Sequence, residues 1–241
     1  MSARLRRLTV RLRRLTTDRP VDKLAVAAEL LPVLAALAVG RQLSRPSRLV
    51  ALLFVLWFCE DIVQQVLIHL HRTNNWVQHL TMPVEAALLL WAFSLWQDRP
   101  VARRAILLSI PIYVVVWLVL QVFVESLDRL SQYAGPMSYL LVLAIAAFTL
   151  VSKSARAVSP GWRQPWFWVS AGMIILMGSQ VALNPITNIL IATHQRGAAI
   201  FQAFGAVGIL SYSLTTWGIL CERRHPSSGG SSSLPPWQLE S

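Results

Sequence analysis

The sequence predicts an all-α protein, a polytopic transmembrane bundle of seven helices joined by short loops. Of its 241 residues, 55% are hydrophobic and only 14% are charged, which is far from the composition of a soluble domain. The apolar residues fall into segments long enough to cross a bilayer. Short polar connections separate these segments, so consecutive helices are expected to be antiparallel neighbours.

The predicted helices cover, in chain order, residues 24–40, 49–71, 76–96, 105–124, 133–151, 166–184 and 197–221. Most of these windows hold about 20 residues, the length that spans the apolar core of a membrane. We expect Pro185 to end the sixth helix. The seventh carries a stripe of mostly small residues, which favours close packing against another helix over ligand contact: Gln202, Gly205, Gly208, Ser211 and Thr215.

Short tails flank the predicted membrane domain, which runs from residue 24 to 221. Residues 1–23 are a basic tail whose arginines and regularly spaced leucines predict an amphipathic helix on an anionic membrane surface, with a solvated, partly disordered tail as the alternative. Residues 222–241 are rich in Ser, Gly and Pro and are expected to be a flexible end.

The net charge of +11 indicates anionic lipid headgroups as partners rather than nucleic acid, because the basic residues lie in a tail and between apolar segments. Outside the N-terminal region, three basic residues fall at one end of the predicted bundle and eleven at the other. Since cytoplasmic loops are the basic ones, we expect a protein of the inner (plasma) membrane with its C-terminus in the cytoplasm. Whether segment 24–40 crosses the membrane then determines on which side of the membrane the basic tail lies.

Three carboxylates lie near the middle of predicted membrane helices, where ionisable residues are rare. Glu60 and Asp61 lie near the middle of the second predicted helix, and Glu85 lies near the middle of the third. An ionisable group at that depth costs roughly 2.5–3.5 kcal/mol. No arginine or lysine lies deep in any predicted span, so the acids are expected to share protons or bind a cation.

Polar residues continue along both of these helices. Asp61, Gln65 and His69 recur every four residues, and a second stripe leads from Asn75 to Glu85. We expect the two stripes to face a common interior and form one polar shaft, with imidazoles nearer the hairpin turn than the acids. A structural hydrogen-bond network between helices is the alternative. The candidate ligand-binding residues are Glu60, Asp61, Gln65, His69, Asn75, His79 and Glu85.

Known catalytic and cofactor signatures are absent from the sequence. His69, His71 and His79 offer nitrogen ligands for a metal, but their spacing is not a specific zinc pattern. The two lysines, Lys23 and Lys153, lie outside the last helix, which excludes a retinal Schiff base there. The sequence contains no Walker loop, G-x-S-x-G or H-E-x-x-H motif. No catalytic residue and no cofactor are assigned.

Two motifs resemble an uncharacterised bacterial family of seven-helix integral membrane proteins with an N-x-x-x-H-x-x-x-P-x-E hairpin signature. The residues that carry the resemblance are Asn75, His79, Pro83 and Glu85, followed by Pro165, Phe167, Trp168, Val169 and Gly172. The resemblance spans roughly residues 24–221. It implies a seven-helix membrane fold and brings no activity with it.

The leading functional hypothesis is a binding or sensing module for a small ligand or cation. It has no output domain of its own and would need a protein partner for output. The alternatives are a proton- or cation-coupled transporter, motivated by the three carboxylates at one depth, and an intramembrane metal-dependent enzyme.

Overall fold

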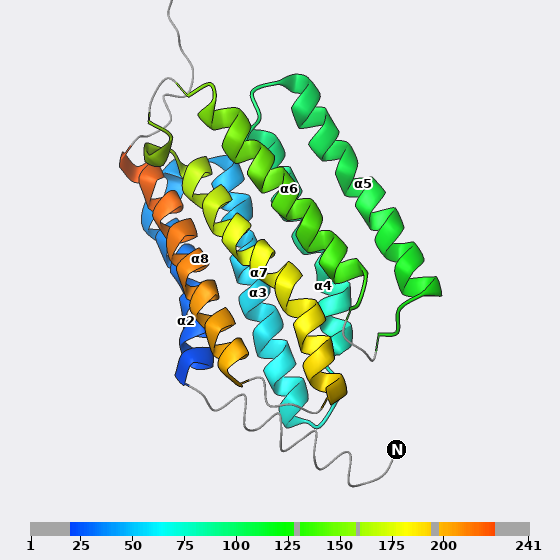
Figure 1. Cartoon of the computed structure of the whole chain (residues 1–241). Coiled ribbons are helices and arrows are strands. Elements are labelled where there is room, and N and C mark those ends of the chain that lie inside the picture. Colours follow the sequence, from blue (N-terminus) through cyan, green and yellow to red (C-terminus); the bar gives the residue numbers. More distant parts are fainter. Residues whose placement is uncertain (1–19, 128–130, 158–159, 194–197, 225–241) are drawn as a thin grey trace, which may run out of the picture.

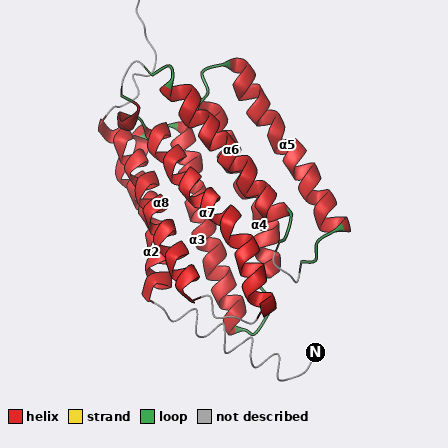
Figure 2. Cartoon of the chain, in the orientation of Figure 1, coloured by secondary structure: helices red, strands yellow, loops and turns green. Residues whose placement is uncertain are grey.

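The structure is a computed structural model that describes residues 20–127, 131–157, 160–193 and 198–224. Within these ranges the chain forms seven long α-helices and two short 3-10 turns, and no strand (Figure 2). The helices are α2 (Pro20–Val39), α3 (Arg45–His69), α4 (Asn75–Trp96), α5 (Pro100–Phe123), α6 (Ala134–Ser154), α7 (Pro165–Thr193) and α8 (Ala198–Arg224). The predicted all-α bundle is therefore confirmed, while both predicted tails lie almost wholly outside the described residues.

Six of these helices, α3 to α8, are long and apolar enough to cross a membrane, and the chain is a multi-pass membrane protein. Helix α2 is not among the six. It has 20 residues, a length of about 30 Å, but its sequence includes Asp22, Lys23 and Glu29.

The helices pack in a closed arrangement with one outlier. Helix α2 lies against both α3 and α8, and α7 packs between α6 and α8. Helix α4 contacts α3, α5 and α6. Helix α5 lies at the edge of the bundle, against α4 and to a lesser extent α6 (Figure 1). The core is built where α3, α4 and α7 meet, around Phe54, Phe93 and Met173, which are fully buried.

Several helices begin earlier than their hydrophobic windows. Helix α3 starts at Arg45 and α5 at Pro100, four and five residues before the apolar stretches predicted to begin at 49 and 105. Both carry a proline in their first turn, where the missing N–H costs nothing and the fixed φ suits a helix. Hydropathy marks the lipid-facing length of a helix and misses a polar first turn at the interface.

The predicted helix end at Pro185 is wrong. Helix α7 continues through this position to Thr193. Prolines also lie inside α2, α4 and α5, at Pro32, Pro83 and Pro111. Prolines are tolerated inside membrane helices because neighbouring groups satisfy the carbonyls that they free.

The predicted close packing of the last helix is confirmed at its contact with α7. The Ser211 hydroxyl donates to the Gly172 carbonyl at 2.7 Å. A Cβ at Gly172 would lie 2.7 Å from the Thr215 hydroxyl oxygen and 2.8 Å from the Ser211 carbonyl oxygen. The two backbones approach this closely because position 172 has no side chain.

Candidate functional site

The centre of the candidate site is a pair of carboxyl groups from adjacent helices. Glu60 of α3 is buried, and its two oxygens accept hydrogen bonds from the Gln64 amide at 2.7 Å and the Thr81 hydroxyl at 2.6 Å. The Glu85 carboxyl of α4 is an electrostatic neighbour of Glu60 and lies near Trp57 and Thr81. Two carboxyl groups can share a hydrogen bond only with a proton between them.

A second acidic pair lies on the other side of α3. Glu29 of α2 is 9% exposed, and one of its oxygens accepts a hydrogen bond from the Tyr212 hydroxyl at 3.1 Å. Its other oxygen, Oε2, is buried without a hydrogen-bond partner in the described part of the chain. Asp61 and Glu60 both lie within electrostatic range of this carboxyl. These four acids from three helices form two pairs on opposite sides of α3 and are together called the acidic cluster here: Glu29, Glu60, Asp61 and Glu85.

An aromatic group links the two halves of this acidic cluster. Trp57 faces Glu85 and packs against Tyr212 with a ring-centroid distance of 6.5 Å. Phe54 packs edge-on against both rings. The Tyr212 hydroxyl donates to Glu29 and Trp57 lies near Glu85, so these rings lie between the two acidic pairs, as expected for aromatic residues with one polar end.

Among the described residues, no basic side chain forms an ion pair with the acidic cluster. Across the described residues, the ion pairs within 4 Å join Lys153 to Asp98 at the surface and His79 to Glu125. Neither involves a member of the acidic cluster. Burying an unpaired charge is costly, so the four acids need protons or a bound cation.

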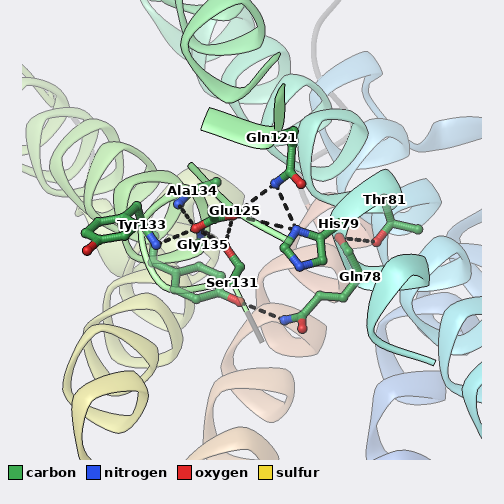
Figure 3. A network of polar contacts seen from close by, with 10 residues as sticks. Gln78, His79, Thr81, Gln121, Glu125, Ser131, Tyr133, Ala134 and Gly135 are labelled. Carbon is green, nitrogen blue, oxygen red and sulfur yellow. Dashed lines mark hydrogen bonds and ion pairs between the residues drawn. The ribbon is translucent and has the colours of Figure 1, made fainter. Parts of the chain in front are cut away.

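A second polar network joins α4 to the connection between α5 and α6 (Figure 3). His79 is 1% exposed, and its Nδ1 lies 2.8 Å from the Gln121 amide nitrogen and 3.6 Å from Glu125 Oε2. Gln121 also donates to Glu125 at 3.0 Å. On its other side Glu125 accepts hydrogen bonds from the Ser131 hydroxyl and from two backbone N–H groups, those of Tyr133 and Ala134.

Local sequence explains why Glu125 takes this position. Helix α5 ends at Phe123, and the backbone then turns so that the Glu125 N–H donates to the Leu120 carbonyl at 2.8 Å. Ala134 begins α6, and the first N–H groups of a helix have no intrahelical partners. The carboxylate therefore binds at the N-terminus of α6, which also favours it through the helix dipole.

These donors control the protonation of Glu125. Burial alone would raise the pKa of this carboxyl, but the backbone N–H groups of Tyr133 and Ala134, the Ser131 hydroxyl and nearby His79 together hold its pKa below the ordinary value. Glu125 is therefore a carboxylate at neutral pH.

Polar side chains lie between the two networks. The Gln78 amide donates to the Tyr139 hydroxyl at 3.4 Å, and Tyr139 lies within electrostatic range of both Glu85 and Glu60. Tyr113 lies within range of Glu85 and Glu125. In this region a hydrogen bond joins α4 to α6 through Gln78 and Tyr139, while the Tyr113 hydroxyl of α5 is buried without a partner among the described residues.

The structure does not form the single polar shaft expected from the sequence. Glu60, Asp61 and Glu85 come together, but Gln65 and His69 are exposed on the outside of α3. The His69 ring bonds only the Gln65 carbonyl of its own helix, at 3.0 Å. Asn75 is half-buried at the start of α4, and His79 faces Gln121 and Glu125.

The three histidines do not form one site. His69 and His71 are exposed, whereas His79 is buried. His71 has a φ of 55° and ends α3, with the N–H groups of His71 and Arg72 donating to the carbonyls of Ile68 and Leu67, the pattern of a Schellman cap. Among the described residues, no group of three or more His, Cys, Asp or Glu side chains is arranged to hold a metal ion.

Several polar residues of these networks were missed by sequence reasoning. Glu29 was an available signal, since it is an acid inside an apolar segment. Gln121 and Glu125 are spaced four residues apart at the end of a helix, which places them on one face. Thr81 and Tyr139 give no such signal, because hydroxyl groups occur on any face of a membrane helix.

The fold and these networks define a class, a multi-pass α-helical membrane protein with buried acidic residues. The chain matches no known protein family, no curated protein and no solved structure. Membership of the seven-helix family with the N-x-x-x-H-x-x-x-P-x-E signature therefore stays a prediction.

Proposed function

We propose that this protein is a cation-binding module of the membrane, whose site is the acidic cluster and whose simplest occupant is a proton shared by Glu60 and Glu85. The observation that carries the proposal is the burial of Glu60 in the middle of α3, where its oxygens accept hydrogen bonds from Gln64 and Thr81 and no basic partner lies within 4 Å among the described residues. A site that needs a proton or cation to be stable responds to the concentration of that ion.

The donors around Glu60 and Glu85 support this occupant. Gln64 and Thr81 each supply one hydrogen bond to Glu60, and the second carboxyl of Glu85 nearby supplies a place for a proton. The Glu29 oxygen that has no hydrogen-bond partner among the described residues offers a second place for a proton, on the Asp61 side of α3. We assign Glu60, Asp61 and Glu85 as binding residues, and add Glu29 to the predicted set.

A proton-coupled transporter is the second candidate, and the placement of Tyr113 and Tyr139 favours it. These phenols and Gln78 lie between the acidic cluster and the His79–Glu125 network. Hydrogen-bonding side chains in such a series can pass a proton along the membrane normal. Pumping would show as proton uptake into liposomes that contain the protein, whereas a binding module would leave their internal pH unchanged.

Replacing Glu85 with Gln tests the site. The amide keeps the shape and can still donate to Glu60, so a merely structural network should lose no more than about 1 kcal/mol. A site that binds a proton or cation should lose the dependence of Tm on the concentration of that ion. We expect Glu85→Gln to fold and melt in detergent nearly as the wild type does under one reference condition, while losing the dependence of Tm on pH and on added Na⁺ or K⁺.

Two further variants sharpen this test. Asp98→Asn removes one negative charge from an exposed carboxylate and should keep the full ion dependence. His79→Ala should weaken it in part, because His79 belongs to the neighbouring network. If wild type and Glu85→Gln melt alike at every pH and in every cation, the acidic cluster has a structural role only.

A further inference from the structure

A basic cavity opens at the end of the bundle where α8 finishes. Its wall includes Arg99 and Ala102 from the start of α5, and Phe148, Ser152, Lys153 and Arg156 from the end of α6 and beyond. The cavity measures about 70 Å³. Since a single water needs roughly 10–15 Å³, it has room for a phosphate group.

The lining is positively charged. Lys153 donates to both oxygens of Asp98 at 2.8 and 2.9 Å and lies 5.9 Å from the centre of the Trp166 ring, which fixes its position. Arg99 and Arg156 are exposed and have no carboxylate partner among the described residues. Three cations (Arg99, Lys153, Arg156) against one carboxylate (Asp98) leave a net charge of +2 on the wall.

An apolar surface leads away from the cavity. Phe148 is 46% exposed and lies on the outer face of α6, which continues toward the middle of the membrane with the exposed Leu140. In a bilayer this face touches acyl chains. The cavity therefore joins a cationic, phosphate-sized space at headgroup depth to a surface for hydrocarbon.

We propose that this cavity binds the phosphodiester headgroup of an anionic phospholipid. The guanidinium groups of Arg99 and Arg156 contact the phosphate oxygens, which suits their forked donors, and an acyl chain lies against Phe148. Basic pockets between membrane helices are typical sites for anionic headgroups. The ion pair of Lys153 with Asp98 holds the two helix ends in the geometry that the headgroup meets. The site does not depend on the acidic cluster.

Native mass spectrometry of the full-length protein in detergent tests the proposal, with phosphatidylglycerol as the probe. Phosphatidylcholine and inorganic phosphate are the comparison arms. We expect phosphatidylglycerol to bind in preference to phosphatidylcholine, and inorganic phosphate not to displace it. The double variant Arg99→Gln/Arg156→Gln should bind phosphatidylglycerol roughly 30-fold more weakly, from the attraction that each basic residue has for an anionic lipid.

Two variants separate a built site from general surface charge. Arg41→Gln/Arg45→Gln removes the same charge from the same end of the bundle outside the cavity, and should change binding less than about twofold. Ala102→Phe fills the cavity and keeps every charge, and should weaken binding as well. Circular dichroism melts confirm that each variant is folded. The proposal is overturned if the control pair weakens binding as much as the cavity pair, if Ala102→Phe binds like wild type, or if inorganic phosphate competes.

Discussion

Buried acids in this protein are stabilised in two different ways. Glu125 lies just beyond the end of α5 and accepts backbone N–H groups at the start of α6, so its charge is satisfied by donors that any helix provides. Glu60 lies in the middle of α3 and accepts one amide and one hydroxyl, with Glu85 beside it. The first arrangement fixes a carboxylate, whereas the second leaves a place for an exchangeable ion.

The depressed pKa of Glu125 predicts a loss of stability in acid. Its folded pKa lies below the ordinary value of 4.5, so its contribution is fully present above that pH and is lost as pH falls through the folded pKa. Tm measured in detergent should therefore drop as pH falls from about 5 toward 3. Glu125→Gln cannot ionise, and we expect it to lose about 1 kcal/mol at neutral pH and to melt with less dependence on pH in that window. A slope equal to that of wild type would remove Glu125 as its source.

Helix ends are tied together across the sequence at the basic end of the bundle. Glu222, near the end of α8, accepts hydrogen bonds from the Ser44 backbone N–H, the Ser44 hydroxyl and the buried Ser47 hydroxyl. Both serines lie where α2 turns into α3. This contact holds the turn between α2 and α3 against α8, and so helps to keep α2 beside the two helices that supply Asp61 and Tyr212.

The contact between α7 and α8 yields a sharp packing prediction. Gly172→Ala would place a Cβ 2.7 Å from the Thr215 hydroxyl oxygen and 2.8 Å from a backbone oxygen of Ser211, and backbone atoms yield little. We expect this variant to lose about 1–3 kcal/mol, seen as a lower Tm in detergent. Gly178→Ala is the matched control on the same helix, because its Cβ would meet nothing within 4 Å. Equal melting of the two variants would contradict the close approach of these helices.

Hydropathy predicted the positions of the helices along the chain well, but it could not predict which face of each helix points into the bundle. The segments were predictable because each is a long apolar run, and six of them are apolar enough to cross a membrane. Pairing Glu60 with Glu85 was predictable too, because a short turn makes α3 and α4 antiparallel neighbours at matching depth. The prediction that Gln65 and His69 face the interior with Asp61 is wrong. Four residues turn a helix by about 400°, so each successive residue of the stripe lies about 40° further around the helix axis. Asp61 is half-buried, so the stripe rotates outward from it.

The contacts that α2 and the connection between α5 and α6 make with the rest of the site could not be predicted from the sequence, for a different reason. Glu29 reaches Tyr212 across 183 positions of the chain, and His79 reaches Glu125 across a helix. Packing of the whole bundle decides which helices become neighbours. A single sequence does not show which helices these are. Adjacent residues Glu60 and Asp61 point about 100° apart, and only the neighbours of α3 show that one faces α4 and the other α2.

At the scale of the whole molecule, basic residues are sorted to one end. In the described part of the chain, eleven lie at the end where α8 finishes: Arg41, Arg45, Arg48, Arg99, Arg103, Arg104, Lys153, Arg156, Arg163, Arg223 and Arg224. Only Lys23 and Arg72 of the described residues lie at the opposite end. The lipid-headgroup cavity is at the basic end, so its side of the membrane follows from the same asymmetry.

This asymmetry predicts the topology. Short loops rich in Lys and Arg stay in the cytoplasm, so a green fluorescent protein fused after Ser241 should fluoresce and an alkaline phosphatase fused there should be inactive. The opposite pair of results would reverse the assignment.

A second set of fusions ahead of Leu24 then decides whether α2 crosses the membrane. Because α2 lies antiparallel to α3 along the bundle, we expect it to cross, which places its start outside the cell membrane and makes alkaline phosphatase active at that position. An inactive enzyme there would show that α2 does not cross, and that Glu29 reaches the acidic cluster without a membrane-spanning helix.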